Sequence, residues 1–375
     1  MNYREYKKDG AKVSLLGYGG MRFPQKDGKI DREKSQKLID RAYSAGVNYF
    51  DTAYMYHNGE SELFYAEALA KYPRDSYFLA DKMPVWMAKN EADVDRIFNE
   101  QLAKCNTDYF DFYLLHSVND DVYNTSHKFN VFEKLNEYRK KGKIKRLGFS
   151  FHGSIELLEK IIEEFDWDFV QLQLNYFDWD YQNAKRQYEI VTEHGLQCLV
   201  MEPVRGGALV HLTDEADEML KSLRPDLSVP SWAMRFVASL EGVLCILSGM
   251  TDENALEDNI SALSDSEPFT EADRDAVFRA SQMLIDAKTL PCTACNYCSD
   301  CPKGIAIPKL FAIYNEYQIS GNSYSLKESY SELKEGDKPF NCIDCGLCAK
   351  RCPQGISVPS KLKDVLKLAE KHDLK

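Results

Sequence analysis

The residues best suited to chemistry are cysteines gathered toward the C-terminal end of the sequence. Eight of the eleven cysteines lie in two short runs, and each run ends in a Cys-Pro pair. Three thiolates at two-residue spacing, followed by Cys-Pro, suit the corners of a 4Fe-4S cube. A zinc site of four thiolates, the alternative, uses CxxC pairs separated by a longer loop. The sequence therefore predicts iron–sulfur binding by Cys292-x2-Cys295-x2-Cys298-x2-Cys301 and Cys342-x2-Cys345-x2-Cys348-x3-Cys352.

The spacing of the second run predicts that the two runs form one unit. It matches the bacterial ferredoxin pattern, in which the fourth cysteine of a run binds the cluster of the other run. The first run departs from this pattern, because two residues instead of three precede Cys301. Outside the runs, Cys105, Cys198 and Cys245 lie inside predicted helices or strands, where a free thiol packs as a small apolar group. We expect two 4Fe-4S clusters, one held by Cys292, Cys295, Cys298 and Cys352, the other by Cys342, Cys345, Cys348 and Cys301.

A second set of residues could carry out acid–base chemistry on a carbonyl group. A tyrosine, with a pKa of about 10, is too weak an acid to protonate a carbonyl oxygen efficiently at neutral pH. A buried ammonium would lower that pKa, and a carboxylate would hold the ammonium in place. Tyr56, Lys82 and Asp51 supply these groups, and His116 could orient the carbonyl or pass the proton. Taken singly, each residue also has a structural explanation, as a buried ion pair or a core side chain.

The elements that position these residues repeat about every thirty residues from Lys12 to Leu263. Short apolar runs alternate with amphipathic stretches, such as 91–104 and 155–164, whose apolar residues are three and four apart. This alternation predicts βα units, and eight strands are enough to close a barrel. An open doubly wound sheet is the alternative, but no GxGxxG follows the first strand. The predicted strands are 13–19, 48–53, 77–83, 110–116, 144–150, 169–175, 197–203 and 243–249.

In a parallel barrel, residues that end the strands line one common mouth, where barrel enzymes hold their active sites. The polar residues at the predicted strand ends are Asp51, Lys82, His116, Ser150, Gln171, Asn175 and Glu202.

At these positions the sequence resembles the aldo/keto reductase family. The similar segments are 13–19, the Asp-Thr-Ala-x-x-Tyr motif at 51–56, and 147–150, together with Lys82, His116 and Gln171. The motif at 201–207 and the cysteine runs narrow the resemblance to a branch with a C-terminal ferredoxin-like domain. The resemblance implies an α/β fold of the (β/α)8 TIM-barrel type, followed by a small, mainly helical iron–sulfur domain. It also implies reduction of an aldehyde or ketone by a nicotinamide cofactor.

The resemblance further implies a role for each matching residue. Tyr56 would be the general acid, Lys82 and Asp51 would tune it, and His116 would orient the substrate. Ser150 and Gln171 match residues that hold the nicotinamide carboxamide. Phe151 and Met201 stand where the family has an Asn and an aromatic ring, respectively. The implied cofactor-binding residues are Gly20, Met21, Ser150, Gln171, Met201, Arg205, Gly207, Gly249, Asn254 and Asn259.

The choice between NADP and NAD depends on the segment after the last strand. Members of the family bind the 2′-phosphate of NADP with basic side chains, whereas Gly249 and Ala255 stand at those positions here. Glu253 would repel a phosphate. The sequence therefore leaves both NADP and NAD open and puts the usual NADP preference in doubt.

Composition limits the partners and the compartment. The net charge is −12, and the acidic residues are spread along the chain, so no basic face for nucleic acid is expected. No apolar run approaches the roughly 18 residues of a membrane helix, and Met1–Gly10 is charged. We expect a cytoplasmic protein with a barrel in residues 1–265. A linker helix and the ferredoxin-like domain should occupy residues 266–375.

Three functions remain open at this stage. The first is a nicotinamide-dependent carbonyl reductase whose clusters are structural or weakly coupled. The second is a reductase that receives electrons from a ferredoxin-type partner. A flavin would normally mediate between one-electron clusters and a hydride carrier, yet no feature indicates a flavin site. The third is a redox sensor or electron carrier built on a barrel that has lost its activity.

Overall fold

The computed structural model describes residues 1–264 and 267–374 and divides the chain into two compact units. The barrel unit comprises residues 1–203 and 233–269, and the cysteine-rich unit comprises residues 204–232 and 270–375. The boundary expected at residue 265 falls outside the described residues. No helix in the described part of the chain is long and apolar enough to cross a bilayer.

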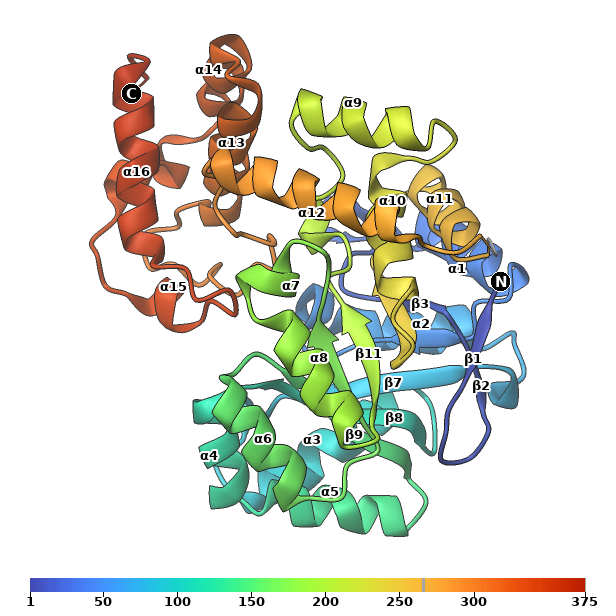
Figure 1. Ribbon diagram of the computed structural model, residues 1–375. Coiled ribbons are helices and arrows are strands. Elements are labelled where there is room, and N and C mark those ends of the chain that lie inside the picture. The colour runs from blue at the N-terminus through green and yellow to red at the C-terminus, as the bar shows by residue number, and fades with distance from the viewer. Residues whose placement is uncertain (265–266, 375) are drawn as a thin grey trace. The chain divides into compact units, whose positions relative to one another are not determined.

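Eight parallel strands close the barrel unit, as predicted (Figure 1). Around the barrel the strand order is β10, β11, β12, β3, β6, β7, β8 and β9. Barrel strands that follow one another in sequence are therefore neighbours in space, and the pairing of β12 with β3 closes the barrel. The strands are β3 (Leu16–Gly19), β6 (Tyr49–Asp51), β7 (Phe78–Met83), β8 (Phe110–Val118), β9 (Ile144–Phe151), β10 (Phe169–Gln173), β11 (Gln197–Met201) and β12 (Val243–Ser248).

Amphipathic helices follow the strands and cover the outside of the barrel (Figure 1). In α6, for example, Ser154 caps the first turn through the Leu157 amide, and the apolar pair Ile161 and Ile162 is buried. The helices are α1 (Arg32–Ser44), α2 (Glu60–Leu69), α3 (Glu91–Lys104), α4 (Asp120–Lys128), α5 (Val131–Lys140), α6 (Ile155–Glu164), α7 (Asp178–Tyr181), α8 (Ala184–Glu193), α10 (Val229–Ala238) and α11 (Glu253–Ser264).

The predicted strand 13–19 is two strands. β2 (Lys12–Ser14) pairs with β1 (Tyr3–Glu5) as an antiparallel hairpin, and only β3 joins the barrel. The chain changes partners at Leu15, whose amide bonds to the Asn2 carbonyl and whose carbonyl bonds to Ile246 of β12. Another small antiparallel pair, β4 (Gln25–Lys26) and β5 (Lys29–Ile30), follows β3.

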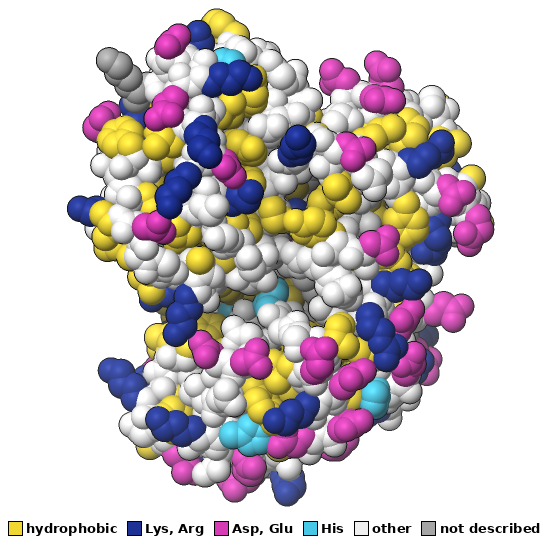
Figure 2. Space-filling view, turned by 60° about the vertical axis from the view of Figure 1, so that its left-hand side comes forward, with side chains coloured by type: hydrophobic (Ala, Val, Ile, Leu, Met, Phe, Trp, Pro, Cys, Tyr) yellow, Lys and Arg dark blue, Asp and Glu magenta, His cyan; other side chains and the backbone are white. Residues whose placement is uncertain are grey.

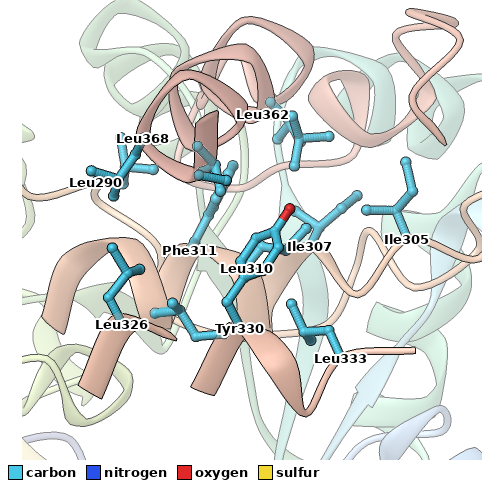
Figure 3. Packing of buried hydrophobic residues seen from close by; sticks show 14 of the residues in the cluster. Leu290, Ile305, Ile307, Leu310, Phe311, Leu326, Tyr330, Leu333, Leu362 and Leu368 are labelled. Carbon is cyan, nitrogen blue, oxygen red and sulfur yellow. The ribbon is translucent and has the colours of Figure 1, made fainter. Parts of the chain in front are cut away.

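The core of the cysteine-rich unit lies between its helices. α13 (Ile307–Ser320) and α16 (Val358–Lys371) contribute Leu310, Phe311 and Leu362, with Ile305 and Ile356 from the turns that follow the cysteine runs (Figure 3). The unit also contains α9 (Asp214–Leu223), α12 (Glu271–Asp286) and the short α15 (Leu347–Lys350).

Residues 321–339 are mostly polar or turn-forming, yet they contain the helix α14 (Ser323–Ser331). Asn322 caps this helix through the amides of Tyr324 and Ser325. Leu326 and Tyr330, four residues apart, are both buried in the core (Figure 3). Two apolar residues in a polar segment are a weak helical signal, so tertiary burial decides this helix.

The two strands that present Ser150 and Gln171 approach closely at Gly148. Gly148 is paired with Phe169, and a Cβ at Gly148 would lie 2.5 Å from the Phe169 carbonyl oxygen and 2.8 Å from its ring. We predict that Gly148→Ala destabilises the barrel by about 1–3 kcal/mol, because β9 and β10 must separate. Urea unfolding followed by near-ultraviolet circular dichroism would measure the change.

Gly336→Ala is the control, because a Cβ there meets nothing within 4 Å and the backbone is not left-handed. Equal stability of the Gly148→Ala variant and the wild type would contradict the close approach of the two strands.

Candidate active site

Six of the predicted site residues face the interior of the barrel. Tyr49, Ala80, Phe112, Phe169 and Leu199 form the packed interior nearer the other end of the barrel. Residues two positions further along each strand share the same face, since side chains alternate across a strand. Two residues beyond these interior positions, on the same face, lie Asp51, Lys82, Gln171 and Met201. His116 lies four residues beyond Phe112, also on the inner face. Ser150 is the strand partner of Gln171 across β9 and β10.

A buried ion pair joins the ends of β6 and β7. The ammonium of Lys82 lies 2.5 Å from Asp51 Oδ1 and donates to the Thr52 carbonyl at 2.8 Å. The side chains of Lys82 and Asp51 are 0% and 4% exposed. Burial raises the pKa of Asp51, and the charge of Lys82 and its hydrogen bond oppose that shift. A charge this deep is tolerated only with a partner, so each residue requires the other.

Tyr56 lies on a turn and not on a strand. It begins the short 3-10 helix η1 (Tyr56–Gly59), in which His57 and Asn58 have left-handed backbones, with φ of 52° and 57°. The His57 ring fixes this turn by accepting the Phe23 amide at 3.1 Å. As a result, the Tyr56 ring lies 5.1 Å from the Lys82 ammonium and 6.0 Å from the His116 ring, at 84° to it.

The electrostatics of Tyr56 differ from the sequence-based expectation. Burial raises its pKa well above the usual value, and the carboxylates of Asp51 and Glu202 raise it further, while Arg22 opposes them. The expected lowering by Lys82 does not prevail, because Asp51 neutralises the ammonium at close range. Tyr56 therefore keeps its proton throughout the neutral range.

His116 is a neutral imidazole at physiological pH. Burial lowers its pKa well below the usual value, and the charges of Lys82 and His152 lower it further. The Trp86 ring packs beside it at 5.1 Å, and Trp86 is 40% exposed. A neutral imidazole next to an aromatic wall can hydrogen-bond to an uncharged carbonyl without adding charge to the site.

Ser150 and Gln171 form a donor and acceptor pair that suits a carboxamide. Ser150 Oγ accepts the Ser117 amide at 2.7 Å, so its hydroxyl hydrogen can be donated elsewhere. Gln171 Nε2 donates to Met201 Sδ at 3.3 Å, while its Oε1 is buried and accepts no hydrogen bond from the described residues. A primary amide offers the matching carbonyl oxygen and N–H groups, so these residues fit a nicotinamide.

The segment after β12 carries no cation. Gly249 packs against Arg22, where a Cβ would lie 2.8 Å from Arg22 Cβ. Asn254 is exposed, but Asn259 is buried and donates to Ser248 Oγ at 3.0 Å. Nearby, Arg41 on α1 is already bound by both carboxylate oxygens of Glu257, at 2.5 and 2.7 Å. Residues 249–259 therefore provide no basic side chain of their own, and the guanidinium of Arg41 is already paired.

The other residues predicted to bind the cofactor are Gly20 and Met21, which follow β3, and Arg205 and Gly207. Gly20 follows β3, where its amide bonds to the Asp51 carbonyl at 2.7 Å and a Cβ would meet the Tyr65 ring at 2.6 Å. Met21 follows directly and is half-buried. Arg205 and Gly207 belong to the cysteine-rich unit, and their role toward a nicotinamide stays a prediction.

Seven of the eight cysteines of the two runs line two hollows; Cys298 lines both, and Cys342 is not among the lining residues of either. The larger, about 340 Å³, is lined by Cys292, Cys295, Cys298 and Cys352, together with apolar residues such as Phe311. The second, about 220 Å³, is lined by Cys298, Cys301, Cys345 and Cys348. Burial and then the thiols of Cys295, Cys292 and Cys352 raise the pKa of Cys298 to about 12. Cys342 and Cys301 act in the same way on Cys348.

The spacing of these thiols differs from that of the ligands of a single zinc ion. Thiolates on tetrahedral zinc lie about 3.8 Å apart, given Zn–S bonds of about 2.3 Å. Among the described residues, no three of the eight thiols come within 4.8 Å of one another. A cube places each thiolate on a different iron and so holds the sulfur atoms further apart.

Three contacts of the barrel site were not predicted from the sequence. His57 stabilises the turn of Tyr56, Trp86 covers His116, and Asp81 accepts the Lys82 amide at 2.8 Å. The adjacency of Asp81 to Lys82 was visible in the sequence. The other two contacts depend on the conformation of loops and have no local signal.

Comparisons with known proteins agree with this geometry. Residues 15–278 match the aldo/keto reductase family, and residues 291–356 match a 4Fe-4S dicluster domain. The chain is 22% identical over 295 residues to an uncharacterized oxidoreductase of Bacillus subtilis, YqkF, covering 70% of this chain and 91% of the relative. It is also 22% identical to the NADH-specific methylglyoxal reductase of Escherichia coli, over 64% of this chain and 86% of that protein.

Solved structures share the barrel. An aldo-keto reductase of Bacillus halodurans in its holo form superposes with a TM-score of 0.61 at 22% identity, over 75% of this chain and 96% of that one. An aldo/keto reductase of Brucella melitensis gives 0.58 at 20% identity, over 74% and 99%.

Proposed function

The chain belongs to the aldo/keto reductase family of oxidoreductases and carries a 4Fe-4S domain, and on this premise we propose that its barrel reduces a small aldehyde or ketone with NADH. The observation that carries the proposal is the approach of the Tyr56 ring to both other groups, 5.1 Å from the Lys82 ammonium and 6.0 Å from the His116 ring. A bound nicotinamide would supply the hydride for the carbonyl carbon.

Tyr56 supplies the proton that converts the carbonyl oxygen to a hydroxyl. Its raised pKa keeps the proton in place until charge develops on the substrate oxygen. The ammonium of Lys82 then lies close enough to stabilise the phenolate that remains. His116, being neutral, donates a hydrogen bond to the same oxygen and orients it. Asp51 holds Lys82 charged and in place.

Removal of the Tyr56 hydroxyl tests this mechanism. We predict that Tyr56→Phe lowers kcat for carbonyl reduction about 10²- to 10⁴-fold, the usual contribution of a general acid. NADH binding, measured by fluorescence, should persist, because Ser150 and Gln171 are unaffected. Tyr54→Phe is the control, since the Tyr54 hydroxyl bonds to Glu100 on α3. Wild-type turnover by the Tyr56→Phe variant would refute the assignment of the acid.

We propose NADH as the preferred cofactor. Residues 248–259 contain no Lys or Arg, and Glu253 opens the helix at which a 2′-phosphate would be expected. The nearby Arg41 is engaged by Glu257. The Escherichia coli relative is named an NADH-specific methylglyoxal reductase, which is consistent with this choice.

A change of charge beside the expected 2′-phosphate position tests the cofactor preference. We predict that the wild type has a higher kcat/KM with NADH than with NADPH. The double change Glu253→Gln and Ala255→Arg should narrow the ratio at least tenfold, because a phosphate then gains a cation and loses a repelling carboxylate. Glu193→Gln, an exposed carboxylate on α8, is the control. An initial preference for NADPH would overturn the proposal.

We also propose that the cysteine-rich unit binds two 4Fe-4S clusters, each completed by one thiolate from the other run. The hollows support the exchange of thiolates, since Cys352 lines one hollow with three cysteines of the first run, and Cys301 lines the other with Cys345 and Cys348. The pKa shifts indicate the same two groups of cysteines. Cys352 helps to raise the pKa of Cys298 in the first run, and Cys301 helps to raise that of Cys348 in the second. When bound, the clusters would accept and donate single electrons.

A second candidate function is electron exchange with a ferredoxin-type partner. The observation that favours it is the exposure of Cys345, whereas the other seven cysteines of the runs are half-buried. On the face displayed in Figure 2, acidic and basic side chains are interspersed. We nevertheless favour the first function, because the acid–base residues of the barrel are all present and assembled.

One cysteine variant distinguishes these functions. We predict that the anaerobically purified chain holds about eight iron atoms and that Cys345→Ala lowers this to about four. NADH-dependent carbonyl reduction should persist in that variant, because the barrel residues do not depend on the cluster. Cys198→Ala, a buried cysteine outside the runs, is the control for iron content. Loss of turnover in a folded Cys345→Ala variant would favour the electron-transfer function.

A further inference from the structure

A second polar cluster lies behind Lys82, between the barrel wall and the helices. Lys82 points into the barrel, so its neighbour Asp81 points the opposite way, toward α2 and α3. There, ligand atoms of Asp81, Glu62 of α2 and Cys105 at the end of α3 all lie within 4.8 Å of one another. The three residues are 0%, 0% and 4% exposed.

This cluster holds the backbone of Lys82. β6 ends at Asp51, which pairs with Ala80, so Lys82 lies beyond the last residue of β7 that has a partner in β6. Two side chains instead form the hydrogen bonds to Lys82 that a longer β6 would have made. Asp81 Oδ1 accepts the Lys82 amide at 2.8 Å, and Gln101 Nε2 donates to the Lys82 carbonyl at 3.0 Å. Gln101 is held in turn by the Tyr113 hydroxyl at 2.5 Å.

The cluster contains two carboxyl groups but only one cation. Glu62 Oε2 accepts the Lys104 ammonium at 2.9 Å. Among the described residues, no Lys or Arg side chain forms an ion pair with Asp81, because the Lys82 ammonium lies inside the barrel with Asp51. The remaining oxygen of Glu62, Oε1, is buried and accepts no hydrogen bond from an N–H or hydroxyl group of the described residues. Two buried carboxylates cannot both stay charged beside a single ammonium.

We infer that Asp81 is a neutral carboxylic acid at physiological pH, shares its proton with Glu62, and acts as a positioning residue for Lys82. The role in catalysis rests on the proposed function, in which Lys82 serves the general acid. With Asp81 protonated, the cluster holds one negative charge, on Glu62, opposite the one positive charge of Lys104. Asp81 Oδ1 can still accept the hydrogen bond from the Lys82 amide. Protonation also keeps a further negative charge away from Tyr56, whose pKa an ionised Asp81 would raise.

The titration of the cluster is consistent with this assignment. Burial raises the pKa of Asp81 well above the usual range, and the neighbouring charge of Glu62 raises it further. Burial also raises the pKa of the Cys105 thiol, so Cys105 stays protonated and adds no charge. The titratable and charged groups that face Asp81 are Glu62 and Lys104 from the helices, Cys105, Tyr113 of β8, and Lys82 and Tyr56 from the barrel side.

The sign of the pH dependence follows from linkage. An unfolded aspartate loses its proton near pH 3.9, about its ordinary pKa. Asp81 keeps its proton in the folded state above that pH. The unfolding equilibrium constant therefore rises about tenfold per pH unit until the folded group ionises. An asparagine does not titrate. Asp81→Asn should therefore have the same unfolding equilibrium constant as the wild type near pH 4, and one at least tenfold smaller than that of the wild type near pH 7.

The experiment compares Asp81→Asn and Asp81→Ala with wild-type holoprotein by urea unfolding between pH 4 and 8. Asp273→Asn is the matched control, since Asp273 is also buried and accepts a backbone amide, that of Thr270 at 2.7 Å, but pairs with Arg224 at 2.8 Å, and its hydrogen bonds lower its pKa. The control should lose stability at pH 7, because Arg224 loses this counter-charge. A loss of stability in Asp81→Asn like that of the control would overturn the proposal, since Asp81 would then be ionised.

Kinetics and spectroscopy provide independent readouts. Asp81→Ala should lower kcat at least tenfold with little change in the KM for NADH, and Asp81→Asn should recover most of that loss by restoring an acceptor for the Lys82 amide. Labelling the aspartate carboxyls with carbon-13 in the wild type should reveal a protonated-acid carbonyl band in the infrared at pH 7. Absence of that band overturns the proposal without requiring a variant to fold. So does stoichiometric binding of added zinc that is lost in Asp81→Asn.

If the wild type proves to reduce no carbonyl compound, the proposed function fails. The stability and infrared results still decide the protonation state of Asp81.

Discussion

The ammonium of Lys82, fully buried at the end of a barrel strand, is the constraint on which the rest of the site depends. A charge in that position is stable only if other groups surround it, and the barrel provides them from three sides. Asp51 neutralises the ammonium, the Thr52 carbonyl accepts a second hydrogen bond, and the Tyr56 ring lies over it. Behind the strand, Asp81 and Gln101 hold its backbone. Together these contacts make a buried charge compatible with the folded barrel.

The closed parallel sheet explains how such distant residues meet. Side chains that alternate along each strand direct every second residue inward, and parallel strands direct all their carboxyl ends to one mouth. Asp51, Lys82, His116 and Ser150 are spread over a hundred residues of sequence, but they occupy consecutive strands β6 to β9. Tyr56 is the exception, because it reaches the site from a turn. Its position is fixed by the turn and not by a strand. His57 and Asn58, which follow it, have left-handed backbones, and the His57 ring accepts a hydrogen bond from the Phe23 amide.

The chain joins two kinds of redox chemistry that differ in the number of electrons moved. A nicotinamide in the barrel would move a pair as hydride, whereas iron–sulfur clusters move one at a time. The barrel residues are arranged to manage a proton, with a tyrosine kept protonated, a histidine kept neutral and a lysine kept charged. The cysteine-rich unit instead arranges soft thiolates around apolar hollows, with Phe311 and Ile307 beside the cysteines of one of them. The two units thus place their chemistry in separate, individually packed cores.

The sequence by itself determined the elements whose signals are local. Strand and helix periodicity predicted all eight barrel strands, strand ends identified Asp51, Lys82, His116, Ser150 and Gln171, and spacing identified the eight cysteines of the 4Fe-4S domain. Only the tertiary structure decided the properties that arise from burial and from contacts between distant segments. It raised the pKa of Tyr56 where the sequence suggested lowering, split the segment 13–19 into a hairpin strand and a barrel strand, and made a helix of polar residues 323–331. It also brought Glu62 and Asp81 together beside one lysine. Desolvation and charge pairing depend on everything that surrounds a group, and neighbouring letters in a sequence do not contain that information.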